Sequence, residues 1–208
     1  MYVRITRVQS PPDRLDDIVR YFKEDAVPAV RQLSGYEGAV LAVDRASGDG
    51  QAVTFWDSLE SLKASEEAAT GIRTRTVAAG GGEVAGVQRL EVALLERRGA
   101  PQTPAFLRVI RGKADPSRID AMIQATRDQA LPVLRTVTGF VALNVAVDRQ
   151  SGDAVITGVY QTAEAREAGG NALADVRTSI FEQAGSAPPQ ISLYEAMSVE
   201  FVHAAATV

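Results

Sequence analysis

The sequence contains no cysteine and a single histidine, His203. The absence of cysteine excludes disulfides, thiolate nucleophiles and cysteine-ligated zinc or iron–sulfur sites. One histidine excludes a histidine-rich metal site within one chain. It lies beyond the last predicted strand, where we expect it to have no ligating role. The sequence therefore predicts no metal site. We also expect no bound cofactor.

Neither sign of charge is in large excess, because 22 basic residues stand against 26 acidic ones and give a net charge of −4. A broad positive face for a phosphate backbone is not implied, so we expect no nucleic-acid partner. The N-terminal residues lack the apolar core of a signal peptide, and no long apolar run is present. We expect no membrane segment and a cytoplasmic location.

The sequence contains an internal repeat. Shifting it by 104 residues aligns residues 2–96 with 106–200 without a gap, and about a quarter of the pairs are identical. The matched words include Asp44–Asp49 over Asp148–Asp153. A segment with two prolines and a glycine separates the copies. We expect one repeat over 1–96, a linker over 97–104 and a second repeat over 105–203.

Both copies show the same order of periodicities. In the first, alternation predicts strands at 2–8, 36–43, 50–56 and 87–95, and spacings of three and four predict helices at 12–33 and 59–79, the second broken near Gly71. Pro28, like Pro132 in the copy, lies late in a helix, where it should remove a hydrogen bond and bend the last turns. The resulting order is β-α-β-β-α-β, the ferredoxin-like unit.

Each such unit covers one sheet face with helices and leaves the other bare. Both faces of the last strand are apolar, so the bare face needs a cover. We therefore predict an α+β fold of two tandem ferredoxin-like repeats packed sheet to sheet as an intrachain dimeric α+β barrel, with a further homodimer left open. Two separate beads that each pair with another chain are the alternative.

Paired arginines stand in the first strand of each repeat. In a ferredoxin-like sheet the first and last strands are neighbours, so we expect cross-strand ion pairs, or else a charged anchor for an anionic ligand, from Arg4 and Arg7 with Glu91 and from Arg108 and Arg111 with Glu195. The adjacent acids Glu66 and Glu67 are typical of a solvated helix face.

The end of the first helix carries a family resemblance. Residues 27–36 and 131–140, with the strand-to-helix junction at 54–60, resemble the antibiotic biosynthesis monooxygenase (ABM) family over nearly the whole chain, twice. The resemblance implies a small pocket in each half, between sheet and helices. Some members oxidise aromatic polyketides with dioxygen and without metal or flavin, and others degrade haem. The asparagine, tryptophan and histidine of the haem-degrading branch align here with Thr6, Ser65 and Arg75, and in the copy with Ile110, Gly169 and Ser179.

Six residues are candidates for ligand binding. Trp56 and its counterpart Tyr160 end buried strands and either belong to the core or line a pocket. Arg73 and Arg177 occupy equivalent helical positions, either on a solvated face or within reach of an acidic or phenolate substrate. The other two are Tyr21, an aromatic residue of the first repeat only, and Asn144, an amide among apolar strand residues that needs partners if buried.

These observations favour a protein that binds a small hydrophobic or aromatic molecule. One hypothesis is an ABM-like monooxygenase without a cofactor, in which an arginine stabilises a substrate phenolate. The alternative is a non-catalytic ligand-binding or assembly module without haem-degrading activity. A cavity of about 300 Å³ or more lined by Trp56, Tyr21 or Asn144 would favour the first.

Overall fold

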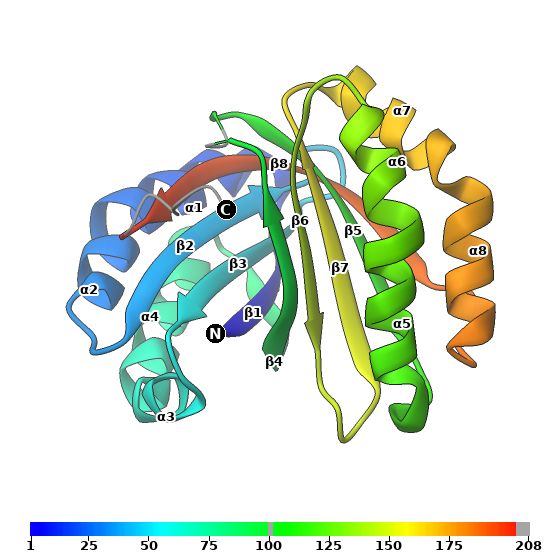
Figure 1. Ribbon diagram of the computed structural model, residues 1–208. Coiled ribbons are helices and arrows are strands. Elements are labelled where there is room, and N and C mark those ends of the chain that lie inside the picture. The colour runs from blue at the N-terminus through cyan, green and yellow to red at the C-terminus, as the bar shows by residue number, and fades with distance from the viewer. Residues whose placement is uncertain (100–101, 203–208) are drawn as a thin grey trace. The chain divides into compact units, whose positions relative to one another are not determined.

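A computed structural model describes residues 1–99 and 102–202 (Figure 1). The first half of the chain forms, in order, β1 (Tyr2–Gln9), the 3₁₀ turn η1 (Pro12–Arg14), α1 (Leu15–Tyr21), the π-helical turn η2 (Phe22–Ala26), α2 (Val27–Arg31), β2 (Tyr36–Val43), β3 (Asp49–Trp56), α3 (Leu59–Ala64), α4 (Glu66–Ala79) and β4 (Glu83–Arg97).

The second half repeats this order. It forms β5 (Ala105–Lys113), η3 (Pro116–Arg118), α5 (Ile119–Ala125), the π-helical turn η4 (Thr126–Ala130), α6 (Leu131–Thr136), β6 (Phe140–Val147), β7 (Asp153–Tyr160), α7 (Ala163–Ala172), α8 (Ala174–Gln183) and β8 (Gln190–Phe201). The predicted linker at 97–104 includes residues 100–101, which lie outside the described residues, as does His203.

The chain divides into two compact units whose boundaries fall inside strands. Unit 1 comprises Met1–Leu90 and the chain from Tyr194 to the end of the described residues, and unit 2 comprises Glu91–Leu193. The boundaries cut β4 after Leu90 and β8 before Tyr194. Each unit therefore holds most of one repeat together with the final part of the other repeat's last strand.

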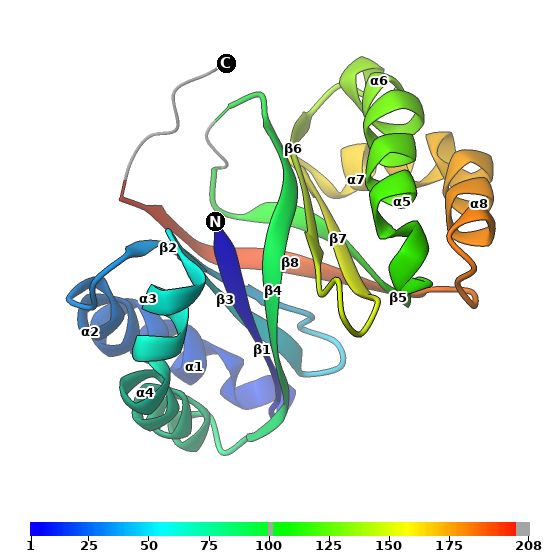
Figure 2. The same ribbon diagram turned by 60° about the horizontal axis from the view of Figure 1, so that its bottom comes forward.

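In unit 1, β3 lies between β1 and β2, and the final part of β8 extends the sheet beyond β2. All three pairings are antiparallel, with Arg4 opposite Thr54 between β1 and β3 and Val40 opposite Val199 between β2 and β8. Helices α1, α2 and α4 cover one face of this sheet (Figures 1 and 2). Between sheet and helices lies an apolar core that includes Trp56.

Unit 2 has the same plan. Strand β7 lies between β5 and β6, and the final part of β4 pairs with β6, with Leu95 opposite Asn144. Helices α5 to α8 cover one face of these strands (Figures 1 and 2). Its core includes Tyr160, which packs edge-on against Phe140 with ring centroids 5.9 Å apart.

In hydrogen-bonding order the eight strands run β1-β3-β2-β8-β5-β7-β6-β4 and close as a barrel. The predicted α+β fold with a duplicated ferredoxin-like plan is therefore confirmed. None of the described helices is long and apolar enough to cross a membrane.

The helices break at other places than the sequence suggested. The second helix is interrupted at Ser65, between α3 and α4, and Gly71 lies inside α4. Pro28 follows a π-helical turn, and Pro132 follows the equivalent turn in the second repeat. Because proline cannot donate the hydrogen bond of a regular α-helix, a wider turn just before it accommodates the missing N–H group.

The predicted pairing of strand-one arginines with Glu91 and Glu195 is wrong for the two acids. Glu91 pairs with Arg149 at 2.9 Å, and Glu195 lies 4.0 Å from Arg45. Both acids stand in the final parts of β4 and β8, which pair with β6 and β2. Their neighbours are therefore the arginines of the turns that follow β6 and β2.

Candidate functional site

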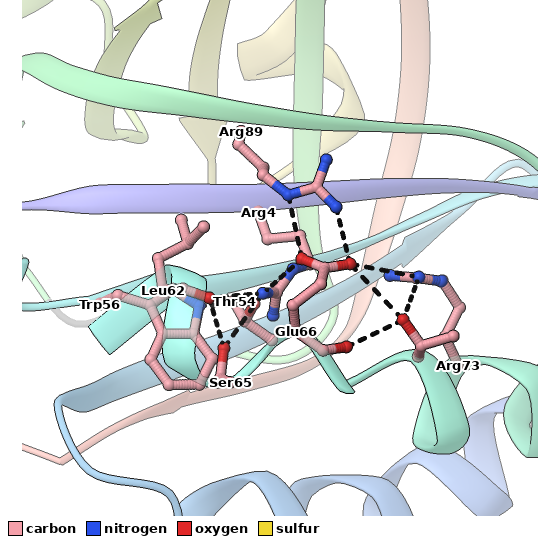
Figure 3. A network of polar contacts seen from close by, with 9 residues as sticks. Arg4, Thr54, Trp56, Leu62, Ser65, Glu66, Arg73 and Arg89 are labelled. Carbon is pink, nitrogen blue, oxygen red and sulfur yellow. Dashed lines mark hydrogen bonds and ion pairs between the residues drawn. The ribbon is translucent and has the colours of Figure 1, made fainter. Parts of the chain in front are cut away.

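Arg4, in the middle of β1, is the centre of the polar network in unit 1 (Figure 3). Its side chain is only 3% exposed. Strand alternation turns Arg4, Thr6 and Val8 toward the helices, where they line a cavity. The guanidinium lies over the ring of Trp56, with 5.5 Å from Cζ to the ring centroid. This distance is that of a cation–π contact.

The break between α3 and α4 supplies acceptors to Arg4. Arg4 Nη2 donates to the carbonyl oxygen of Leu62 at 2.7 Å and to Oγ of Ser65 at 3.0 Å. Carbonyls of the last turn of a helix have no partner within the helix, so the end of α3 leaves Leu62 free to accept. Ser65, at the break, also donates to Leu62 O at 2.7 Å.

Glu66, the first residue of α4, lies among three arginines (Figure 3). One carboxylate oxygen is 3.0 Å from Arg4, and the other is 2.6 Å from Arg89 and 3.5 Å from Arg73. Partial burial raises the pKa of Glu66, but the hydrogen bond from Arg89 and the charges of Arg4 and Arg89 outweigh it and lower the pKa to about 2. Glu66 is therefore ionised at neutral pH, and the four groups together carry an excess of positive charge.

A cavity of about 60 Å³ lies between the sheet and the helices of unit 1. Its walls are mostly apolar and come from β1, β2, β3, η2, α2 and α4. Arg4, Thr6, Thr54, Arg73 and Thr76 supply the polar groups. At roughly 10–15 Å³ for each water, this space holds about four to six waters, or a ligand with one ring.

Several donors at this cavity have no acceptor. Nε and Nη1 of Arg4 and Nη1 of Arg73 are buried and make no hydrogen bond within the described chain. Burial lowers the pKa of Arg4, Glu66 raises it, and the charges of Arg89 and Arg73 lower it again. Arginine keeps its proton in proteins, so these N–H groups remain hydrogen-bond donors without an acceptor. A ligand oxygen would satisfy them.

Of the candidates in unit 1, Arg73 lines the cavity, whereas Trp56 and Tyr21 do not. Trp56 is fully buried below Arg4, and its Nε1 donates to Oγ1 of Thr54 at 3.0 Å. Tyr21 accepts a hydrogen bond from Nε of Arg75 at 3.2 Å on the surface. Arg73 therefore belongs to the site directly and Trp56 through its contact with Arg4, whereas Tyr21 lies outside the site.

In unit 2 the candidates Tyr160 and Arg177 lie close to Arg108, the counterpart of Arg4. Tyr160 is 2% exposed. Burial raises its pKa, and the charge of Arg108 opposes the rise. Arg177 donates to the carbonyl oxygen of Gly170 at 3.3 Å. Asn144 lies elsewhere, in β6, and its Oδ1 is buried with no partner among the described residues.

The sequence of this chain is similar to those of mycobacterial proteins. It is 30% identical over 167 residues to the uncharacterized protein Rv2557 of Mycobacterium tuberculosis, which covers 80% of this chain and 74% of the relative. The chain belongs to the family of Rv2557. A second member, the uncharacterized protein Rv2558 of the same organism, is 30% identical over 148 residues, 71% of this chain and 62% of that protein. No family model matches the chain.

Solved structures share the fold of this chain. An anthrone oxidase-like protein superposes over 100% of this chain and 95% of its own, with a TM-score of 0.69 and 13% identity. A ferredoxin-fold protein related to antibiotic biosynthesis monooxygenases, from Listeria monocytogenes, gives 0.52 at 7% identity, over 95% and 96% of the two chains. The haem-degrading enzyme LmHde of Listeria monocytogenes gives 0.53 at 10%, over 93% and 98%. At these identities the comparisons show the fold alone.

Glu66 was missed by the sequence reading, which placed it on a solvated helix face. The duplication held a signal: the arginines at Arg4 and Arg73 recur as Arg108 and Arg177, but Glu66 is replaced by Gly170. A carboxylate that is present beside the arginine pair of one repeat and absent beside that of the other indicates that the two units bind different groups there.

Proposed function

We propose that unit 1 binds a small, mostly apolar molecule that presents an oxygen acceptor, carboxylate or phenolate, to Arg4 and Arg73. The observation that carries the proposal is the set of buried, unpartnered donor nitrogens of these two arginines at an apolar cavity. A buried donor without an acceptor costs roughly 1–3 kcal/mol, which a ligand oxygen would recover. Because three arginines surround one carboxylate, an anionic oxygen is preferred to a neutral one.

The cavity volume limits the ligand. Space of about 60 Å³ suits a single substituted ring and falls short of the roughly 300 Å³ of larger ligand pockets. A ligand with three fused rings would have to displace side chains of η2 or α4. Of the two functions considered from the sequence, a ligand-binding protein is therefore favoured over an oxidase of large polyketides.

Haem does not fit this site. The cavity is far too small for a porphyrin, and the aligned positions that carry the haem-degrading residues in other members are occupied by groups with other roles. Ser65 accepts a hydrogen bond from Arg4 and donates one to the carbonyl oxygen of Leu62. Arg75 donates a hydrogen bond to the hydroxyl of Tyr21. We derive no haem chemistry for this chain.

A second candidate function is oxygenation of a bound phenol without a cofactor. It is supported by the fold shared with an anthrone oxidase-like protein and by Arg4 and Arg73, which would stabilise a phenolate. In such a reaction the substrate is the only reductant: the phenol is oxidised to a quinone, one atom of dioxygen becomes the new carbonyl oxygen, and the other leaves as water with two hydrogens from the substrate. The binding proposal stands without this step.

Titration calorimetry with benzoate, phenol and benzyl alcohol tests the binding proposal. Benzoate is expected to bind most tightly, because its carboxylate meets two guanidinium groups, and benzyl alcohol most weakly. Arg73→Gln should weaken benzoate binding by roughly tenfold or more, since a hydrogen bond to a charged group contributes about 1.5–3 kcal/mol.

The matched control is Arg20→Gln. Arg20 lies on α1, is 65% exposed and, among the described residues, forms an ion pair only with Asp17, so its removal should leave benzoate affinity unchanged. Equal affinity for benzoate and benzyl alcohol, or no effect of Arg73→Gln, would refute the proposal. Oxygen consumption in the presence of a bound phenol then decides the second candidate by itself.

A further inference from the structure

Two arginines of unit 2 meet at one glycine. A Cβ atom built on Gly170 would lie 2.3 Å from Cζ and Nη2 of Arg108, so the guanidinium lies directly against the backbone of α7. From the first turns of α8, Arg177 Nη1 donates to the carbonyl oxygen of the same glycine at 3.3 Å. The guanidinium groups of Arg108 and Arg177 therefore both contact the backbone of Gly170.

In unit 1 the equivalent place holds a carboxylate. The shift of 104 residues aligns Gly170 with Glu66, which lies 3.0 Å from Arg4 and 3.5 Å from Arg73. Those arginines align with Arg108 and Arg177. The second repeat thus has both cations and lacks the anion that bridges them in the first.

No residue of the described chain replaces that anion. Neither Arg108 nor Arg177 forms an ion pair within residues 1–99 and 102–202, and Nε of Arg108 is buried without a hydrogen-bond partner. Burial lowers the pKa of Arg177, and the charge of Arg108 lowers it further. Because arginine does not give up its proton in proteins, the repulsion persists until an anion is bound.

The ring of Tyr160 lies beside the same part of α7. A Cβ atom on Gly169, next to Gly170, would lie 2.6 Å from Cε1 and 2.7 Å from the hydroxyl oxygen of Tyr160. Two consecutive glycines in α7 thus keep the helix surface bare where Tyr160 and Arg108 pack. In unit 1 the same two positions carry Ser65 and Glu66, and both side chains accept a hydrogen bond from Arg4 (Figure 3).

We propose that unit 2 carries a second binding site, in which Arg108 and Arg177 hold a small oxyanion, a carboxylate or a phosphate, as the counterpart of the Glu66 carboxylate that bridges the equivalent arginines in unit 1. The planar guanidinium groups offer paired N–H donors that match either oxyanion. This site is separate from the cavity of unit 1 and does not depend on the function proposed for that cavity.

The test measures anion binding by titration calorimetry on the full chain carrying Arg73→Gln, which weakens the unit 1 site. Inorganic phosphate and acetate are the probes, and the tighter of the two identifies the class of oxyanion. One of them is expected to bind, and adding Arg177→Gln should weaken it by roughly tenfold or more. Arg177→Lys, which keeps the charge and loses the paired donors, should give an intermediate affinity.

Gly170→Glu gives an independent check, because it returns the carboxylate that the first repeat has. It should abolish binding of both probes while far-ultraviolet circular dichroism stays that of the parent protein. If this variant fails to fold, the comparison of Arg177→Gln with Arg177→Lys still decides. The proposal is overturned if neither probe binds the Arg73→Gln protein, or if Arg177→Gln leaves the affinity for the bound probe unchanged.

Discussion

Arg4 and Glu66 form an ion pair in which the arginine side chain is 3% exposed and the glutamate side chain 32%. The pair joins β1 to the first turn of α4, so it fixes the helix on the sheet at the cavity. Breaking such a pair costs more than the pair contributes, because the remaining charge stays buried without its partner. The sheet-to-helix contact of unit 1 therefore depends on Glu66 more than its partial exposure suggests.

Glu66→Gln is expected to lower the free energy of unfolding by about 2–3 kcal/mol at pH 7. The amide removes the one carboxylate with which Arg4, Arg73 and Arg89 pair in the described part of the chain, and Arg4 cannot move into solvent. Urea denaturation followed by circular dichroism measures the change. The control is Glu67→Gln on the exposed side of the same helix, for which a change within about 0.5 kcal/mol is expected. Equal effects of the two variants would contradict the prediction.

The contribution of Glu66 should disappear in acid. Its pKa is about 2 in the folded protein against 4.5 for the free side chain, so the unfolded state binds the proton more readily. The stabilisation is therefore complete above about pH 4.5 and is lost as the pH falls toward 2. Other carboxylates also titrate there, so the measured quantity is the difference between wild type and Glu66→Gln. That difference should shrink steadily from pH 5 to pH 2.5, and a constant difference would show that Glu66 is not the titrating group.

Most of the fold prediction rested on the alternation of apolar residues in the strands and on the internal repeat of the sequence. The strand predicted at 36–43 matches β2 at both ends, because the residues that bound it, Gly35 and the turn at Asp44–Asp49, are its neighbours along the chain. The division of β4 and β8 between units could not be read in the same way. Each of these strands is continuous in the chain, and the strand with which it pairs changes along its length, which local residue spacing does not show.

The candidate site was predicted less completely, for a physical reason. Arg73 was found because it recurs in both repeats. Glu66 is 62 residues from Arg4, and its role arises from the helix break at Ser65, which no glycine or proline marks. Of the two adjacent acids, Glu66 contacts Arg4 of the sheet and Glu67 is exposed to solvent. Tertiary packing alone decides this difference.

Gly35→Ala should destabilise the protein by more than Gly81→Ala. Both glycines have positive φ, +76° and +62°, so each substitution carries the backbone cost of about 1 kcal/mol. A Cβ on Gly35 would also lie 2.3 Å from Oγ of Ser61 and 2.4 Å from Oδ1 of Asp57, whereas a Cβ on Gly81 meets nothing within 4 Å. The extra crowding at Gly35 adds roughly 1–3 kcal/mol. Thermal unfolding of the two variants side by side measures the difference, and equal melting temperatures would contradict it.

Ligand binding in unit 1 should change the fluorescence of Trp56, the single tryptophan of the chain. Its ring is fully buried and lies 5.5 Å from Cζ of Arg4, so a ligand oxygen that draws on this guanidinium alters the charge above the ring. Titration with benzoate is expected to shift or quench the emission with the same dissociation constant as calorimetry gives, and Arg73→Gln should weaken both signals alike. An anion bound to Arg108 and Arg177 should leave the emission unchanged, because Tyr160 takes the place of Trp56 in unit 2. Phosphate that binds by calorimetry and yet quenches Trp56 would place its site in unit 1 and contradict this assignment.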